Sequence, residues 1–196
     1  MNKGRLEAFS DGVIAIIITI MVLELRPPEG ASLENLRPLV PTFLSYLLSF
    51  ALLGTYWNNH HHLLQAARVI DGRCLWANLH LLFWLSLLPF GTAWVGETVF
   101  APVPVAAYGA LLLLAGLAYY LLVRMLISAH GQPAALAEAV GRDVKGKVSP
   151  LLFLIAIPVA LVVPLASMLV YAAVVVMWLV PDRRMEPVIR ADEPRA

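Results

Sequence analysis

Ionisable side chains at the start of an apolar segment are the first feature of this sequence with a chemical consequence. Residues 12 to 23 are apolar apart from Thr19, whereas the two turns before them contain Arg5, Glu7, Ser10 and Asp11. A bilayer core about 30 Å thick needs roughly 20 helical residues, so a spanning helix carries Arg5, Ser10 and Asp11 to the membrane boundary or below it. Charged groups at that depth are costly unless they have partners. Arg5 and Asp11 lie on nearly opposite faces of such a helix, which predicts that they bond to different neighbouring helices.

Histidines provide the second candidate chemistry. Asn58 precedes the consecutive histidines 60 to 62 in one segment, and His80 and Trp84 lie in the next. Consecutive residues on a helix point in different directions, so the three histidines cannot all bind one metal ion. We expect no metal site and interpret the histidines as hydrogen-bonded structural residues. A haem bound between two imidazoles is an alternative, and so is a pH-sensing role, because histidine titrates near neutral pH.

Composition excludes several classes of protein. The 196 residues are 60% hydrophobic and 14% charged, whereas soluble domains are about half apolar and about a quarter charged. The net charge of +1 says nothing about a nucleic-acid partner, but the absence of a basic stripe with interleaved aromatic residues argues against one. A single cysteine, Cys74, excludes an intrachain disulfide and a cysteine-based metal cluster. The first apolar segment is expected to remain in the mature protein, because acidic residues interrupt it.

The apolar segments predict an all-α polytopic membrane protein with six transmembrane helices in a single domain. The expected helices cover about residues 5–25, 42–64, 74–94, 105–127, 150–163 and 167–180, and a polar cytoplasmic tail covers 181–196. One helix over the whole apolar region 150–180 would be about 46 Å long, too long for the bilayer without strong tilt. We therefore expect a tight turn at residues 164–167. Five spans with a kinked last helix are the alternative.

The basic residues distinguish these two topologies. Six spans place 12 of the 14 basic residues on one side of the membrane, and five spans move the last four to the other side. The positive-inside rule favours six spans, with both termini in the cytoplasm and the protein in the cell membrane. The first helix then begins, the second ends and the third begins in the cytoplasmic half of the bilayer. We expect a buried polar network there. Its expected members are Ser10, Asp11, Asn58, His61, His62, His80 and Trp84.

The start of the first helix resembles a known signature. Arg5-x-x-x-Phe9-Ser10-Asp11, followed by an isoleucine-rich helix, is similar to the motif of the endolysosomal potassium channel family. That family includes bacterial members with a single six-helix repeat per chain. The resemblance covers the whole chain in architecture, and in sequence it is sharp in the first helix and around residues 57–62. It implies a homotetrameric potassium channel in which the motif holds the pore helix against its own subunit.

Three aliphatic residues of the first helix, Ile16, Ile20 and Leu23, are spaced by four and three and share one face. On sequence alone they are ordinary lipid-facing or packing residues. The resemblance implies instead that they line the pore, with the narrowest ring at Ile16 and with Thr19 beside them. The sequence contains no Thr-Val-Gly-Tyr-Gly segment for a carbonyl filter. Such a pore is expected to select potassium over sodium only modestly, through its radius and the cost of dehydration.

The expected function is therefore a modestly potassium-selective cation channel, with no enzymatic activity and no bound cofactor. Its expected partners are the lipid bilayer, potassium ions and further copies of the chain. The alternative is a proton- or cation-coupled secondary transporter that uses Asp11 and the histidine cluster, although no internal repeat is evident. An intramembrane enzyme or haem protein is a third interpretation. Against it, the sequence has no Ser/His/Asp arrangement and no nucleotide-binding glycine loop.

Overall fold

The described part of the chain is helical, which confirms the prediction of an all-α membrane protein. The computed structural model describes residues 3–67, 69–129 and 144–179, and these contain helices and no strand. Four helical segments in these ranges are long and apolar enough to cross a membrane: Lys3–Leu23, Leu33–Ala66, Gly72–Glu97 and Pro102–Ala129. Two shorter helices, Val144–Ala160 and Pro164–Leu179, follow them. The expected tail, 181–196, lies outside the described residues.

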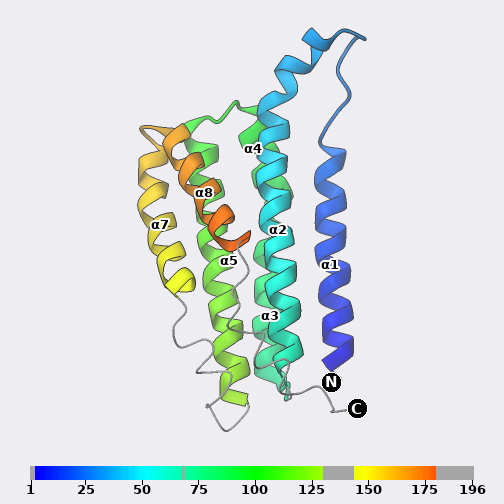
Figure 1. Cartoon of the computed structure of the whole chain (residues 1–196), viewed down its shortest axis with the longest axis vertical. Coiled ribbons are helices and arrows are strands. Elements are labelled where there is room, and N and C mark those ends of the chain that lie inside the picture. The colour runs from blue at the N-terminus through cyan, green and yellow to red at the C-terminus, as the bar shows by residue number, and fades with distance from the viewer. Residues whose placement is uncertain (1–2, 68, 130–143, 180–196) are drawn as a thin grey trace.

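The first two helices are antiparallel neighbours, α1 (Lys3–Leu23) and α2 (Val40–Ala66) (Figure 1). α1 ends shortly before Pro27 and Pro28, which have no N–H to continue a helix. A short 3₁₀ helix, η1 (Leu33–Leu39), then leads into α2. Proline is tolerated in the first turn of α2, at position 41, because the N–H groups of that turn have no partner inside the helix.

The third expected helix, 74–94, is divided in two, α3 (Gly72–Ser86) and α4 (Leu88–Glu97). The division lies at Leu87 and is caused by the proline at position 89. Pro89 has no N–H to donate to the carbonyl four residues earlier, so the regular bonding pattern is interrupted. The N–H of Leu87 bonds to the carbonyl of Trp84 at 3.3 Å, which tightens the last turn of α3.

The start of α3 is fixed by a side-chain cap. Oδ1 of Asp71 accepts a 3.0 Å hydrogen bond from the backbone N–H of Cys74, as is common at helix N-termini. Its other oxygen accepts a 3.0 Å bond from Nε of Arg73. Because the bond from Cys74, and then the neighbouring Arg73, favour the ionised carboxylate, the pKa of Asp71 is lowered to about 2.

The last helices are α5 (Pro102–Ala129), α7 (Val144–Ala160) and α8 (Pro164–Leu179). The turn between α7 and α8 occupies residues 161–163, which corrects the expected turn at 164–167. Pro164 does not form the turn but begins α8, since its fixed φ suits the first helical position and its missing N–H costs nothing there. Ser167 Oγ donates to the carbonyl of Ala156 at 2.7 Å and so fastens α8 to α7.

The helices lie side by side in one bundle, with α1 at one edge and α7 at the other (Figure 1). α1 packs on α2, α3 and α4, and α5 packs on α3, α4, α7 and α8. The beginning of α1, the end of α2 and the beginning of α3 lie at the same end of the bundle (Figure 1). The polar residues of these three helices are therefore close enough to bond to one another.

Candidate functional site

One face of α1 packs into the bundle, and the opposite face carries exposed aliphatic residues. The packed residues follow one another at intervals of three or four: Leu6, Ser10, Ile14, Ile17 and Met21. By contrast, Ile16, Ile20 and Leu23 are 59%, 43% and 76% exposed, and Thr19 is exposed beside them. The four residues singled out in the sequence therefore lie together on a surface that the chain's own helices leave largely uncovered.

A hydrogen bond within α1 fixes the direction of the Thr19 hydroxyl on this surface. The hydroxyl donates to the backbone carbonyl of Ile16 at 2.9 Å, so its hydrogen points back to the helix. The lone pairs of the hydroxyl oxygen remain available on the exposed side. Thr19 therefore contributes an acceptor, which is the chemistry that suits a cation, next to the aliphatic residues.

Side-chain contacts between α1 and α2 form a regular ladder of three rungs. Each rung joins one residue of each helix: Asp11 to Trp57, Glu7 to His61, and Lys3 to the backbone carbonyl of Gln65. The distances between donor and acceptor atoms are 3.0, 3.0 and 2.8 Å in that order. The residues are four apart on each helix and are paired in reverse order, as antiparallel helices require. The ladder therefore fixes the register of α1 along α2.

A chain of buried hydrogen bonds lies beside the ladder and connects α1, α2 and α3. Ser10 Oγ donates to the carbonyl of Leu6 at 2.9 Å and accepts from Asn78 Nδ2 at 3.0 Å. The acceptor oxygen of Asn78 consequently faces Nε2 of His60, 2.7 Å away. Nε2 must therefore carry the proton of the neutral imidazole. Ser10, His60 and Asn78 are fully buried, so this chain of hydrogen bonds excludes solvent.

Two buried imidazole nitrogens, Nδ1 of His60 and Nδ1 of His62, have no hydrogen-bond partner among the described residues. In His60 the bond to Asn78 leaves Nδ1 as a bare acceptor. Such a nitrogen costs free energy when it is buried. In the described ranges, no three or more His, Cys, Asp or Glu residues are grouped so that they could hold a metal ion.

Other members of the expected network lie elsewhere. Asn58 is exposed on α2, because it is rotated by about 100° from Trp57 and points away from α1. His80 accepts a 3.3 Å bond from Trp84 of its own helix, at an exposed site. Arg5 and Phe9 are exposed on the outer side of α1. Asp11 and Arg5 thus face different surroundings, and Arg5 makes no hydrogen bond or ion pair within the described part of the chain.

Five residues outside the expected set of network members are central to these contacts: Lys3, Glu7, Trp57, His60 and Asn78. Their signal is present in the sequence as two sets of residues spaced by four, one on each of two antiparallel helices. Which of three consecutive histidines is buried cannot be read in this way. It depends on the rotation of α2, which tertiary packing sets.

The fold and these contacts define an α-helical integral membrane protein with a polar network at one end of the bundle. A model of the family described as endosomal/lysosomal potassium channel TMEM175 matches residues 5–89. A potassium channel of Chryseobacterium sp. (strain P1-3) is 49% identical over 186 residues, which cover 95% of this chain and 97% of that protein. The chain therefore belongs to the TMEM175 potassium channel family, a family of ion channels and not of enzymes.

More distant relatives cover less of the sequence. A potassium channel of Chamaesiphon minutus is 37% identical over 52% of this chain and 53% of its own length. The human endosomal/lysosomal proton channel TMEM175 is 36% identical over 35% of this chain and 16% of its own length. A crystal structure of a lysosomal potassium-selective channel TMEM175 homologue from Chamaesiphon minutus has a TM-score of 0.78 and 27% identity, and the match covers 90% of this chain and 96% of that one. The family match at residues 5–89 contains most of α1, two of the three rungs of the ladder and the buried chain of hydrogen bonds.

Proposed function

We propose that the chain forms a cation channel that conducts potassium ions through a pore lined by α1. The observation that carries the proposal is the exposure of Ile16, Ile20 and Leu23 on a helix whose other face is packed. An exposed aliphatic face suits lipid as well as a pore, so exposure alone does not decide between them. Membership of a potassium channel family favours the pore.

A pore requires several copies of the chain, because each contributes only one α1. We propose a homotetramer with four α1 helices around a common axis, in keeping with the closed symmetry of most oligomers. The position of α1 at the edge of the bundle leaves its outer face accessible to other subunits (Figure 1). The ladder to α2 supports α1 from the side, so that the helix keeps its register while its outer face meets the axis.

The proposed constriction is the ring of four Ile16 side chains, with rings of Ile20 and Leu23 beyond it. Branched aliphatic side chains repel water, so an ion must lose part of its hydration to pass, and the same ring can close the pore by dewetting. The acceptor oxygen of Thr19 lies beside this ring. A flexible ring with few oxygen ligands discriminates poorly between cations, so we expect only a modest preference for potassium over sodium.

We place this channel in the cell membrane with both termini in the cytoplasm, because that orientation puts 12 of the 14 basic residues on the cytoplasmic side. The polar network then lies in the cytoplasmic half of the bilayer. A reporter fused after Arg184 and found outside the cell would contradict this orientation.

The function is tested with purified protein in liposomes, by comparing flux under a potassium gradient and under a sodium gradient. We expect potassium flux that needs no proton gradient, whereas the coupled transporter, the alternative function, requires one. Ile16→Asn should raise flux and lower the preference for potassium, because an amide wets the ring and offers oxygen to the ion. Val22→Asn is the matched control, since Val22 is also exposed but points about 120° away from the stripe.

An assembled Ile16→Asn variant with unchanged flux and reversal potential would place the constriction on another face of α1. Absence of cation flux from assembled wild-type protein would contradict the proposed function itself.

A further inference from the structure

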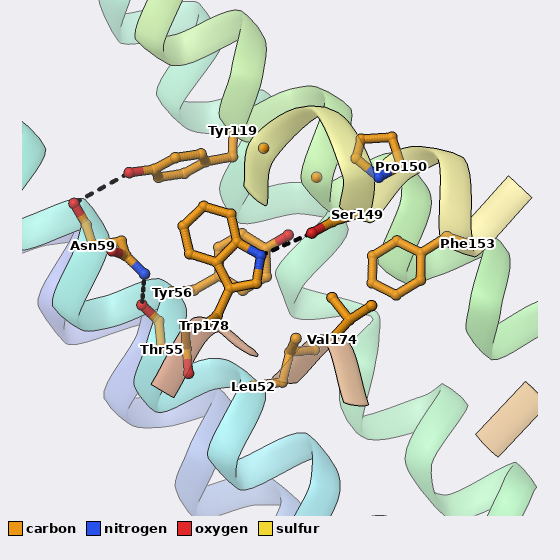
Figure 2. A pocket seen from close by; sticks show the side chains of 12 residues that line it. Leu52, Thr55, Tyr56, Asn59, Tyr119, Ser149, Pro150, Phe153, Val174 and Trp178 are labelled. Atoms are coloured by element: carbon orange, nitrogen blue, oxygen red, sulfur yellow. Dashed lines mark hydrogen bonds between the residues drawn. The ribbon is translucent and has the colours of Figure 1, made fainter. Parts of the chain in front are cut away.

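A cavity lies between α2, α5, α7 and α8, on the side of α2 away from α1 (Figure 2). The space inside it that the centres of water-sized spheres can occupy is about 60 Å³, which is room for roughly four waters or one small organic molecule. None of the described residues that line it has a charged side chain. The cavity is therefore unsuited to an ion, which would lack a counter-charge there.

Aromatic rings form much of the cavity wall, and their positions are fixed (Figure 2). Tyr56 and Tyr119 meet edge to face with ring centroids 5.9 Å apart. The indole of Trp178 donates through Nε1 to Ser149 Oγ at 2.9 Å, and Phe153 lies across from it (Figure 2). Rigid aromatic walls favour a ligand with an aromatic or branched apolar body.

One hydroxyl group at this cavity has no acceptor among the described residues. Thr55 donates to the carbonyl of Ala51 at 2.8 Å, and Tyr119 donates to the carbonyl of Asn59 at 3.2 Å. The hydroxyl of Tyr56, in contrast, has no hydrogen-bond partner in the described ranges. It is therefore a donor available to a molecule in the cavity.

The space in front of this hydroxyl exists because α5 has a glycine there. A Cβ added at Gly116 would lie 3.8 Å from the Tyr56 oxygen, with no other atom closer. Glycine in the middle of a helix is unfavourable relative to alanine. The residue thus opens the cavity at the hydroxyl that lacks a described acceptor, at some cost to α5.

We propose that this cavity binds a small uncharged molecule with an aromatic or branched apolar body and one hydrogen-bond acceptor, which bonds to the Tyr56 hydroxyl. The cavity wall includes Asn59, the residue next to His60 of the buried hydrogen-bond chain. A molecule bound in the cavity therefore contacts α2 one residue away from His60. This proposal does not depend on conduction, because its test measures binding alone.

The test uses two labelled probes of nearly the same shape, acetophenone and α-methylstyrene, in which a CH₂ group replaces the ketone oxygen. Their binding to the protein in lipid nanodiscs is measured by equilibrium dialysis, with empty nanodiscs subtracted. Wild type should bind acetophenone saturably and more tightly than α-methylstyrene. Tyr56→Phe should weaken acetophenone binding roughly two- to tenfold, the value of one hydrogen bond, and leave α-methylstyrene unchanged.

The second part of the test uses a substitution that fills the cavity. Gly116→Leu should abolish saturable binding of both probes. Gly54→Leu is the matched control, because Gly54 does not line the cavity and an added Cβ there meets nothing within 4 Å. If Gly116→Leu fails to fold, the binding of the two probes to Tyr56→Phe still tests the proposal. Unchanged saturable binding in folded Gly116→Leu, equal weakening of both probes in Tyr56→Phe, or absence of saturable binding in wild type would each overturn the proposal. So would a lipid chain that co-purifies with wild type and is lost in Gly116→Leu.

Discussion

The two faces of α1 are built from the same type of residue and have different surroundings. Ile14 and Ile17 are 1% and 4% exposed, whereas Ile16 and Ile20 are 59% and 43% exposed. In a soluble protein the exposed face would be polar, and that contrast in polarity would distinguish the two faces. Here both faces are aliphatic, because lipid, a pore and a protein core all accept isoleucine. Hydropathy therefore identifies the helix but not its rotation about its own axis.

Polar residues supply the orientation that the aliphatic residues do not. Ser10 lies on the packed face and bonds to Asn78, while Lys3, Glu7 and Asp11 follow the edge that meets α2. These contacts hold α1 from two directions near one end of the bundle. They fix the rotation of α1 about its own axis, and this rotation determines which way the exposed isoleucines face.

The largest expected effect comes from placing the same substitution on the two faces. Ile14→Asn should lower the free energy of unfolding by about 3 kcal/mol or more, because it removes packed aliphatic atoms and buries an amide without partners. Ile16→Asn should cost much less, since its amide is not buried within the chain. The measurement is the thermal unfolding midpoint of both variants in detergent, with size-exclusion chromatography to follow aggregation.

Equal loss of stability in both variants would break the comparison, because Ile16 would then be as tightly packed as Ile14. The Ile16→Asn variant also tests whether Ile16 contacts another subunit. A subunit contact at Ile16 would appear as a change in the oligomer peak at an unchanged unfolding midpoint.

A second pair of substitutions compares buried and exposed asparagine. Asn78→Leu leaves the Nε2–H of His60 without an acceptor and Ser10 without a donor, and we expect a loss of about 1–3 kcal/mol. Asn58→Leu on the exposed face of α2 should change stability by less than about 0.5 kcal/mol. Chemical or thermal unfolding of the two variants gives the difference. A destabilisation by Asn58→Leu that matches Asn78→Leu would mean that α2 is rotated so that Asn58 is packed inside the bundle.

The sequence predicts the kind of elements and the apolar segments that form them well, because long apolar segments leave few choices in a membrane. It predicts their ends less well where proline is involved. Pro89 divides a helix that looks continuous, and Pro164 begins a helix instead of turning the chain. Both outcomes follow from the missing N–H of proline, but only neighbouring packing determines which side of the proline remains helical.

The candidate site is predictable only in part, for a geometrical reason. Depth along the membrane can be inferred from chain order, and it brings Ser10, Asp11 and the histidines to one level. Rotation about each helix axis cannot be inferred in this way. Asn58 and His80 share that depth with His60 and Asn78 but point elsewhere, since about 100° separates successive residues.

The ladder provides a third comparison, between a tryptophan that bonds across helices and one that bonds within a helix. Trp57→Phe removes the donor to the Asp11 carboxylate, and we expect a loss of about 1 kcal/mol at this partly exposed site. Trp84→Phe removes a bond to His80 of the same helix and should have a smaller effect. Thermal unfolding of the two matched variants measures the difference. A larger effect of Trp84→Phe would contradict the assignment of the ladder as the contact that fixes α1 on α2.

The smallest expected effect concerns Asp71, which sets the start of α3 and hence the position of Asn78 two turns later. The folded pKa of its carboxyl, about 2, is below the ordinary value of about 3.9. The ionised carboxylate therefore stabilises the folded state above about pH 4, and this contribution disappears as the pH falls through about 2. Asp71→Ser keeps a capping oxygen but does not titrate, so the difference in unfolding midpoint between wild type and variant should shrink from about pH 5 to about pH 2. Arg73→Leu removes only the lesser partner and should retain most of this pH dependence. If wild type and Asp71→Ser respond identically to acid, the cap does not depend on charge, and the start of α3 is held by packing around the buried Cys74 instead.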